Sequence, residues 1–101
     1  MRNKDGVKCD RNGYAPSIMQ TTEECYFCQN PNISRHEIYP GNGRRKISKN
    51  NGFWINLCPK HHALVQDNES WNKPLKIACQ AKYEKTHSHE SFMRLIGKNY
   101  L

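Results

Sequence analysis

Two short pairs of residues in this chain have the types and the spacing of metal ligands. Cys25 and Cys28 form a Cys-x2-Cys pair, and Cys58 and His61 form a Cys-x2-His pair. Each pair can close a tight loop and present thiolate or imidazole ligands to one ion from two directions, which suits the tetrahedral coordination of zinc. The sequence therefore predicts a structural Zn2+ site made by these four residues.

The composition favours such a site over other means of stabilisation. The chain has 101 residues, 36% of them hydrophobic, and a mean hydropathy of -0.98, so we expect one domain with a thin core. Residues 1–8 are polar and charged, which favours an intracellular, cytoplasmic and reducing location, with zinc rather than disulfides for the five cysteines. No run approaches the roughly 20 apolar residues that a membrane span needs, so we expect no membrane partner.

The charge balance indicates a polyanionic partner. Lys and Arg number 16 against 9 Asp and Glu, a formal net charge of +7, and such a field favours the capture of nucleic acid. Part of this charge is concentrated in a glycine-bounded segment, residues 41–52, between the two ligand pairs. We expect a loop whose cations reach phosphates, although a solvated loop without that role is the simpler alternative. The candidate DNA contacts are Arg44, Arg45, Lys46 and Lys49.

The elements that must position these residues are short. We expect residues 1–17 to form a flexible or irregular basic arm, because Asp-Gly and Asn-Gly turn signals and a proline interrupt them. Residues 18–20 favour a short strand before the first cysteine pair. Residues 33–39 and 53–57 contain aromatic and β-branched side chains, which predicts an antiparallel ribbon with the basic loop at its tip.

Helices are expected after the ribbon. The first begins from Cys58, because Pro59 is tolerated in a first turn, and Pro74 marks the start of the second. Residues 92–96 predict a last short apolar helix, ended by Gly97 in a left-handed cap position. In the second helix the three- and four-residue spacing of apolar residues predicts a core face. That face consists of Leu75, Ala78, Cys79 and Tyr83.

Several parts of the chain together resemble the HNH endonuclease family, in particular its small phage-type members. The residues that carry the resemblance are Cys25-x2-Cys28, His36-Glu37-Ile38-Tyr39-Pro40-Gly41, Leu57-Cys58-Pro59-Lys60-His61-His62, Phe92-Met93-Arg94 and Gly97-Lys98-Asn99-Tyr100-Leu101. The resemblance covers residues 18–101 and leaves residues 1–17 outside. It implies an α+β fold with a zinc-stabilised ββα-metal core, or His-Me finger, followed by additional C-terminal helices. It also implies a phage or another mobile element as the source.

The resemblance implies a metal-dependent endonuclease, or a nickase, that hydrolyses DNA phosphodiester bonds. In the family a strand histidine activates water, while a neighbouring residue and a helix histidine bind a divalent ion; here these are His36, Glu37 and His62. Neighbouring helical residues lie about 100 degrees apart, so His62 cannot easily share the zinc ion of the residue before it. Further oxygen ligands for a catalytic Mg2+ or Mn2+ would come from Gln66 or Asp67.

Two assignments of the catalytic base stay open at this point. Alignment on Pro40 places His36 at the acidic position of the family pattern and Glu37 at the base. A shift by one residue makes His36 the base and Glu37 a metal ligand or orienting group. We favour the second assignment, because imidazole is a better proton acceptor at neutral pH than an unperturbed carboxylate. The asparagine of the family name has no exact match, and its candidates are Asn50, Asn51 and Asn56.

A second class of function fits the same residues. A zinc-stabilised nucleic-acid-binding accessory module would use the same fold and the same cations without cleavage. In that hypothesis His36 and His62 complete a hydrogen-bond network and activate no water. Nicking of plasmid DNA separates the two hypotheses.

Overall fold

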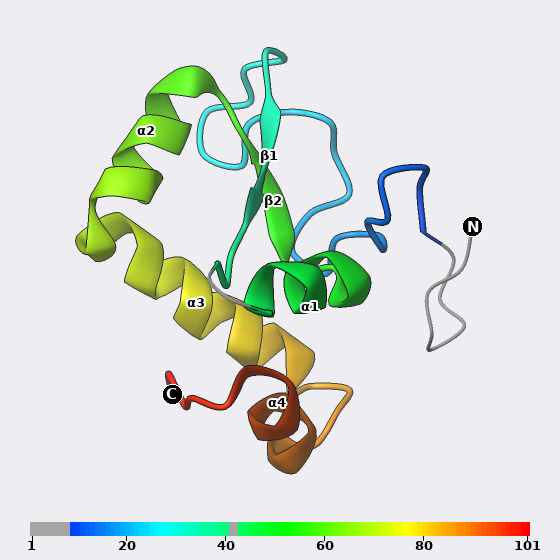
Figure 1. Ribbon diagram of the computed structural model, residues 1–101. Coiled ribbons are helices and arrows are strands. Elements are labelled where there is room, and N and C mark those ends of the chain that lie inside the picture. Colours follow the sequence, from blue (N-terminus) through cyan, green and yellow to red (C-terminus); the bar gives the residue numbers. More distant parts are fainter. Residues whose placement is uncertain (1–8, 41–42) are drawn as a thin grey trace.

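The secondary-structure elements follow each other in the order β-α-β-α-α-α. The computed structural model describes residues 9–40 and 43–101, and these form a two-stranded antiparallel sheet and four helices (Figure 1). The predicted α+β class is therefore confirmed. None of the described helices has the length and apolar character needed to cross a membrane. The strands are β1 (Ser34–Glu37) and β2 (Trp54–Leu57), and the helices are α1 (Arg44–Asn51), α2 (Pro59–Asp67), α3 (Glu69–Tyr83) and α4 (His89–Ile96).

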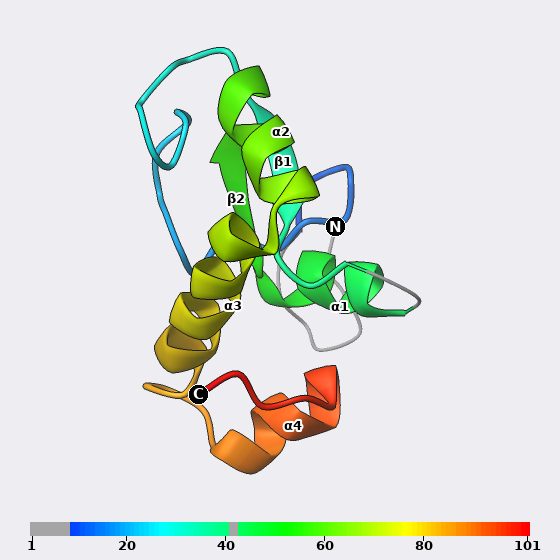
Figure 2. The same ribbon diagram turned by 90° about the vertical axis from the view of Figure 1, so that its left-hand side faces the viewer.

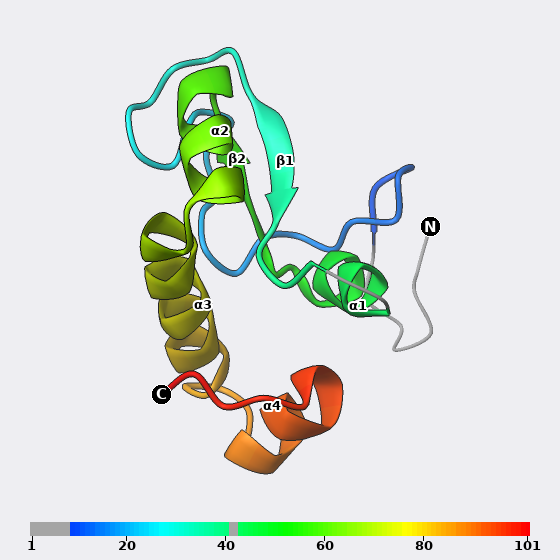
Figure 3. The ribbon, with the colours of Figure 1, turned by 60° about the vertical axis from the view of Figure 1, so that its left-hand side comes forward.

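The register of the two strands decides which side chains share a face. His36 lies opposite Ile55, and Glu37 lies opposite Trp54. Because side chains alternate along a strand, Ser34 and His36 project to one face of the sheet and Glu37 to the other. Helix α2 lies beside β1 on the face of Ser34 and His36 (Figure 3). The predicted antiparallel ribbon is confirmed, with strands shorter than expected.

The basic segment between the strands is a helix, and the predicted loop at the tip of the ribbon is wrong. Helix α1 lies between Gly43 and Gly52, whose φ angles are 79 and 74 degrees. Its Arg and Lys residues are good helix formers. The buried Ser48 fixes the helix to the end of β1, because its Oγ donates to the Tyr39 carbonyl at 3.1 Å and accepts from the Tyr39 N–H at 3.3 Å. Residues 41–42 of the predicted loop lie outside the described residues.

Residues 9–17 have no regular secondary structure, but they pack against β2 and α1. The Ala15 N–H donates to the Lys49 carbonyl at 2.8 Å, and the Ala15 carbonyl accepts from Trp54 Nε1 at 2.7 Å. These bonds attach the described part of the predicted arm to the elements around the candidate site. Residues 1–8 of that arm lie outside the described residues.

The chain before the first cysteine pair is bent. The strand predicted over residues 18–20 is therefore wrong. The Ser17 Oγ accepts hydrogen bonds from the Met19 N–H at 3.0 Å and the Gln20 N–H at 3.3 Å. Such local bonding between side chain and backbone competes with the ladder of a strand. The same hydroxyl donates to the Trp54 carbonyl, which holds the bend against β2.

Polar caps decide where the later helices begin. Helix α2 begins at Pro59, with Cys58 as its N-cap, one residue after the predicted start at Cys58. Helix α3 begins before Pro74, so the predicted start at Pro74 is wrong. The reason is Asn68, whose Oδ1 accepts from the Ser70 N–H at 3.0 Å and caps the helix at an earlier residue. Helix α4 is followed by Gly97 at a φ of 80 degrees, in the cap position predicted for it.

The core lies where the sheet meets α3 and α4. Phe53 is fully buried, and its ring centroid lies 5.5 Å from that of Tyr39 and 5.3 Å from that of Tyr83. Cys79 is also fully buried, as expected for a core residue, whereas Ala78 of the same predicted face is exposed. Figure 2 shows α2 in front of the two strands, with α3 and α4 extending away toward the lower end of the sheet.

Gly52 is a position where a side chain would collide with the backbone. Its φ is 74 degrees, and an added Cβ would lie 2.1 Å from the Pro16 carbonyl oxygen. We predict that Gly52→Ala lowers the free energy of unfolding by about 2 kcal/mol or more, measured by urea denaturation.

Gly97→Ala is the matched control for this prediction. Gly97 has a φ of 80 degrees, but no described atom lies within 4 Å of an added Cβ. Only the backbone strain of about 1 kcal/mol is expected there. Equal losses for the two variants would contradict the packing of residues 9–17 against the end of α1.

Candidate metal centre and the adjoining cleft

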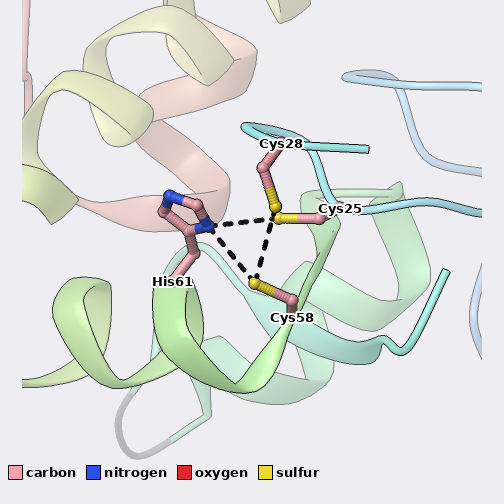
Figure 4. Close-up of side chains that lie close together, drawn as sticks. All are labelled: Cys25, Cys28, Cys58 and His61. Atoms are coloured by element: carbon pink, nitrogen blue, oxygen red, sulfur yellow. Dashed lines mark hydrogen bonds between the residues drawn. The ribbon is translucent and has the colours of Figure 1, made fainter. Parts of the chain in front are cut away.

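Three cysteines and one histidine from two separate segments converge on one point. Their ligand atoms all lie within 4.8 Å of one another. Figure 4 shows Cys25 and Cys28 on the loop before β1, and Cys58 and His61 at the start of α2. The His61 Nδ1 lies 3.2 Å from the Cys58 sulfur and 3.6 Å from the Cys25 sulfur, and the Cys28 and Cys58 sulfurs are 3.7 Å apart. The four residues predicted as ligands are thus brought together.

The loop that carries the first cysteine pair is held by backbone hydrogen bonds. The Gln29 N–H donates to the Cys25 carbonyl at 2.9 Å, and the φ of Gln29 is 63 degrees, a left-handed conformation that tightens the turn. The Tyr26 N–H donates to the Asn56 carbonyl at 2.8 Å. The first cysteine pair is therefore fixed to β2, next to the second pair of ligands.

The electrostatics of the cluster favour metal binding. Burial alone raises the pKa of the Cys25 thiol, but backbone N–H groups of Cys58, Cys28 and Phe27 stabilise the thiolate and lower the pKa to about 6. Three sulfur atoms and one imidazole nitrogen form the donor set of structural zinc sites. The cluster could therefore bind a metal ion such as zinc.

Aromatic rings connect the ligand cluster to α3. The Phe27 ring centroid lies 5.3 Å from the His61 imidazole and 5.4 Å from the Trp71 ring of α3. The Tyr26 ring packs edge-on against Phe27 at 5.3 Å. The two aromatic residues between the first pair of cysteines thus give the cluster an apolar side, and such a surrounding limits the access of water to a metal ion.

A cleft of about 430 Å³ opens beside this cluster, with β1, α2 and α3 contributing to its walls. His36 from β1 and His62 from α2 both line it, and their ring centroids are 5.4 Å apart with the planes at 76 degrees. The Nδ1 atom of His62 lies 2.8 Å from the Ser34 hydroxyl, which orients the ring. Two imidazoles from different elements therefore meet in one cavity.

His36 is a buried imidazole. Only 8% of its surface is exposed, and burial, followed by the nearby His62, lowers its pKa below the ordinary value of 6.5. Asn72 from α3 also lines the cleft, and its effect on the pKa of His36 is smaller and opposite. Within the described chain, the His36 Nε2 and the Asn72 Oδ1 have no partner with hydrogen-bond geometry. Burial thus favours the neutral imidazole, whose Nε2 is itself buried.

Glu37 is held from the other face of β1 and also lines the cleft. Its Oε1 accepts from the Tyr14 hydroxyl at 2.7 Å and from the Arg45 Nε at 3.0 Å. Burial raises the pKa of Glu37, but these two donors outweigh burial, so the pKa lies below its ordinary value. Burial and the adjacent carboxylate raise the pKa of Tyr14 to about 12. The tyrosine thus stays protonated as a donor, and Glu37 carries a fixed negative charge.

The two further residues predicted to bind a catalytic ion lie on different surfaces of α2. Gln66 follows His62 by one helical turn and lines the same cleft. Asp67 is exposed and lines a separate depression together with Lys60. The structure therefore brings Gln66 to the histidines and turns Asp67 away from them.

The cations predicted to contact phosphates lie on α1. Arg45 borders both the cleft and a second hollow of about 510 Å³, which Lys46 and Lys49 also line. The Lys49 Nζ lies 4.9 Å from the centroid of the Tyr14 ring. Arg44 is half-buried at the first position of the helix. Helix α1 thus gathers positive charge directly beside the cleft.

Asn51 and Asn56, which were considered for the middle position, make hydrogen bonds from side chain to backbone. The Asn51 Nδ2 donates to the Ile47 carbonyl at 2.9 Å within α1. The Asn56 Nδ2 donates to the Thr22 carbonyl at 3.2 Å, which ties β2 to the segment before the first cysteine pair. Asn50 lines the hollow over α1.

Three residues of the site, Ser34, Tyr14 and Asn72, were not predicted from the sequence. Ser34 had a usable signal, because it stands two residues before His36 in the predicted strand and must share its face. Tyr14 and Asn72 had none, since each reaches the site from a distant part of the chain. Their positions follow from the packing of residues 9–17 and of α3.

Comparison with known proteins leaves the site to be interpreted from its own geometry. No protein-family model matches the chain, and it matches neither a curated protein nor a solved structure.

Loss of one ligand should release the metal and loosen the fold. We predict that Cys58→Ser no longer carries the one equivalent of metal expected in the purified protein and melts at a lower temperature. The binding energy of such sites is part of the folding energy, on the order of 10 kcal/mol in zinc-finger peptides. Elemental analysis by mass spectrometry and thermal unfolding measure the two effects.

Cys79→Ala is the control, because Cys79 is a buried cysteine of the core outside the ligand cluster. This variant should keep its metal and lose only the packing of one sulfur atom. A wild-type melting curve for Cys58→Ser without metal would show that the cluster does not stabilise the fold.

Proposed function

We propose that this protein is a metal-dependent endonuclease of the HNH type, which hydrolyses phosphodiester bonds of DNA. The observation that carries the proposal is the pair of imidazoles, His36 and His62, that meet at 5.4 Å in a cleft beside a cluster of three cysteines and one histidine. Hydrolysis of a phosphodiester needs a base for water and positive charge at the phosphate. The cleft offers groups for both tasks. In this proposal β1, β2 and α2 form a ββα-metal core.

We assign His36 as the base. A base must be unprotonated at the working pH, and the lowered pKa of this imidazole keeps it neutral. Its Nε2 is buried without a hydrogen-bond partner among the described residues, and in this proposal a water molecule enters the cleft to fill that position. Glu37 suits this task less well, because its lowered pKa makes it a weak proton acceptor at neutral pH.

The residues that would hold a divalent ion are His62 and Gln66, together with Glu37, which projects from the opposite face of β1 but lines the same cleft and has its Oε1 already bound by Tyr14 and Arg45. When His62 donates from Nδ1 to Ser34, its other nitrogen carries a free lone pair, an arrangement usual for metal-binding histidines. Glu37 adds an ionised carboxylate and Gln66 a neutral carbonyl oxygen, so the set suits Mg2+ or Mn2+. When bound, such an ion supplies Lewis acidity at the scissile phosphate. Asp67 is left out of this set because it lies on another surface.

We assign zinc to the cluster of Cys25, Cys28, Cys58 and His61, as a structural ion. Four protein ligands would fill a tetrahedral shell and leave no open position for water or substrate, as in structural zinc sites. The ion would thus hold the first cysteine pair against α2. His62, the next residue of α2, would then point into the cleft and bind the catalytic ion beside the base His36.

The cations of α1 would position the DNA backbone. Arg45, Lys46 and Lys49 are next to the cleft, and the whole chain has a formal net charge of +7. Contacts of this kind orient a duplex without reading its sequence.

A second candidate function is DNA binding without cleavage, by a zinc-stabilised accessory module. The observation in its favour is that Glu37 is already paired with Tyr14 and Arg45 through Oε1. A carboxylate bound in this way is less available to a metal ion. Measurement of activity separates the two functions.

We predict that the wild type nicks supercoiled plasmid DNA with Mg2+ or Mn2+. His36→Ala and His62→Ala should each lower the nicking rate by about 100-fold or more. This is the usual effect of losing a general base, and we expect a similar loss from removing a ligand of the catalytic ion. Agarose electrophoresis of the relaxed and supercoiled forms gives the rates.

His89→Ala is the matched control, because His89 is an exposed histidine of α4 outside the cleft. It should nick at the wild-type rate, and every variant must retain its structural metal. If the wild type binds DNA but nicks it with neither ion, the endonuclease proposal is wrong and the accessory module is supported.

A further inference from the structure

A second basic hollow lies on the side of the molecule where the C-terminal segment returns to α3. Figure 1 shows this segment, in red, running back beside α3. The hollow has a volume of about 620 Å³ and combines three lysines with one carboxylate and one aromatic ring. Its lining residues are Glu69, Lys73, Lys76, Lys98, Asn99 and Tyr100.

A buried glutamine of α3 binds the C-terminal segment that forms one wall of the hollow. Gln80 is fully buried, and its Oε1 accepts from the Tyr100 N–H at 2.7 Å. Its Nε2 donates to the Asn99 Oδ1 at 2.8 Å and to the Glu84 Oε2 at 2.7 Å. Because a buried amide with all these partners is costly to disrupt, it fixes the segment that carries Lys98 against α3.

The charges around this hollow are not balanced. The Nζ atoms of Lys76 and Lys98 lie 5.6 and 5.3 Å from the centroid of the same Tyr100 ring. Glu69 is the one carboxylate among the lining residues, and it reaches Lys76 at 3.5 Å; the Glu69 side chain is 66% exposed and that of Lys76 is 14% exposed. One carboxylate can neutralise only one of the three lysines. The remaining positive charge favours an anion, and phosphate oxygens are suitable partners for ammonium groups.

Residues of α3 line both the hollow and the cleft. Asn72 lines the cleft, and Lys73 and Lys76 follow it within about one turn of the same helix. The charge of Lys76 also reaches His36, since it adds a small part to the lowered pKa of that residue after burial and His62. The cleft is thus bordered by cations at α1 and by cations at α3 and the C-terminal segment.

We propose that Lys73, Lys76 and Lys98 form a second binding site for the phosphate backbone of nucleic acid, which we call the C-terminal lysine site. A strand with one phosphate in the cleft would contact α1 on one side and this site on the other. The inference rests on the proposed function, because it takes nucleic acid as the ligand of the cleft. The site adds contacts along the backbone and leaves the chemical step to the residues of the cleft.

The test compares two triple variants with the same reduction in charge. Lys73→Gln/Lys76→Gln/Lys98→Gln removes the C-terminal lysine site. Lys82→Gln/Lys85→Gln/Arg94→Gln removes three exposed cations that do not line the described hollows around the cleft. Binding of a fluorescent DNA duplex is measured by anisotropy over a range of NaCl concentrations, without added divalent ions. Circular dichroism and metal content confirm that both variants are folded.

The site variant should bind at least tenfold more weakly at low salt. The slope of log K against log salt should become shallower by up to about 2.7, or 0.9 for each phosphate that the protein no longer neutralises. The control variant should keep the wild-type slope. Equally weakened binding in the two variants would overturn the inference, because the loss of net charge alone would then explain the weaker binding. A site variant that binds DNA with the wild-type affinity and salt slope would overturn it as well.

Polyglutamate serves as a second ligand, because an acidic protein segment is the other polyanion that a lysine site could bind. If it competes with DNA as well as unlabelled duplex does, and only when the three lysines are present, the assignment to nucleic acid is overturned. Nicking is scored separately. If the wild type does not nick DNA but the site variant has a changed salt slope, the site is supported and the proposed function is rejected. If the wild type nicks DNA and the site variant keeps the wild-type KM and salt slope, the site is rejected.

Discussion

The position of α2 against β1 and the cysteine-bearing loop depends on one constraint. This constraint is the convergence of Cys25, Cys28, Cys58 and His61. Helix α2 fully buries a single side chain, Val65, so hydrophobic packing alone holds it weakly. The main aromatic core lies at the other end of the sheet, with α3 and α4. Bonds from three sulfurs and one nitrogen to a common ion would stabilise the position of α2, where hydrophobic packing is weak.

The same constraint also orients the cleft. His61 and His62 are neighbours on α2, and neighbouring helical side chains point about 100 degrees apart. With His61 turned toward the sulfur atoms, His62 faces β1, where Ser34 and His36 occupy one face of the strand. Glu37 on the opposite face is held by Tyr14 and Arg45. The position of the candidate ligand cluster therefore sets the geometry of the cleft through one turn of α2.

What could be predicted from the sequence follows the range of each interaction. The two ligand pairs, the presence of the two strands, the start of α2 to within one residue and the end of α4 depend mainly on neighbours in sequence, and they appear where they were expected, with strands shorter than predicted. Helix α1 was missed because its two flanking glycines occur both in loops and at helix ends, and Ser48, which fixes the helix to β1, acts through a tertiary contact. Tyr14 reaches Glu37 from a distant segment without any local pattern.

X-ray absorption spectroscopy at the metal edge examines the coordination of the cluster itself. A zinc ion held by these residues should show three sulfur neighbours at about 2.3 Å and one nitrogen neighbour at about 2.0 to 2.1 Å. His61→Cys should convert this shell to four sulfurs, while His62→Ala should leave it unchanged. A wild-type protein with no bound metal, or with a shell of oxygen and nitrogen atoms, would contradict the assignment of the cluster and, with it, the proposed origin of the cleft.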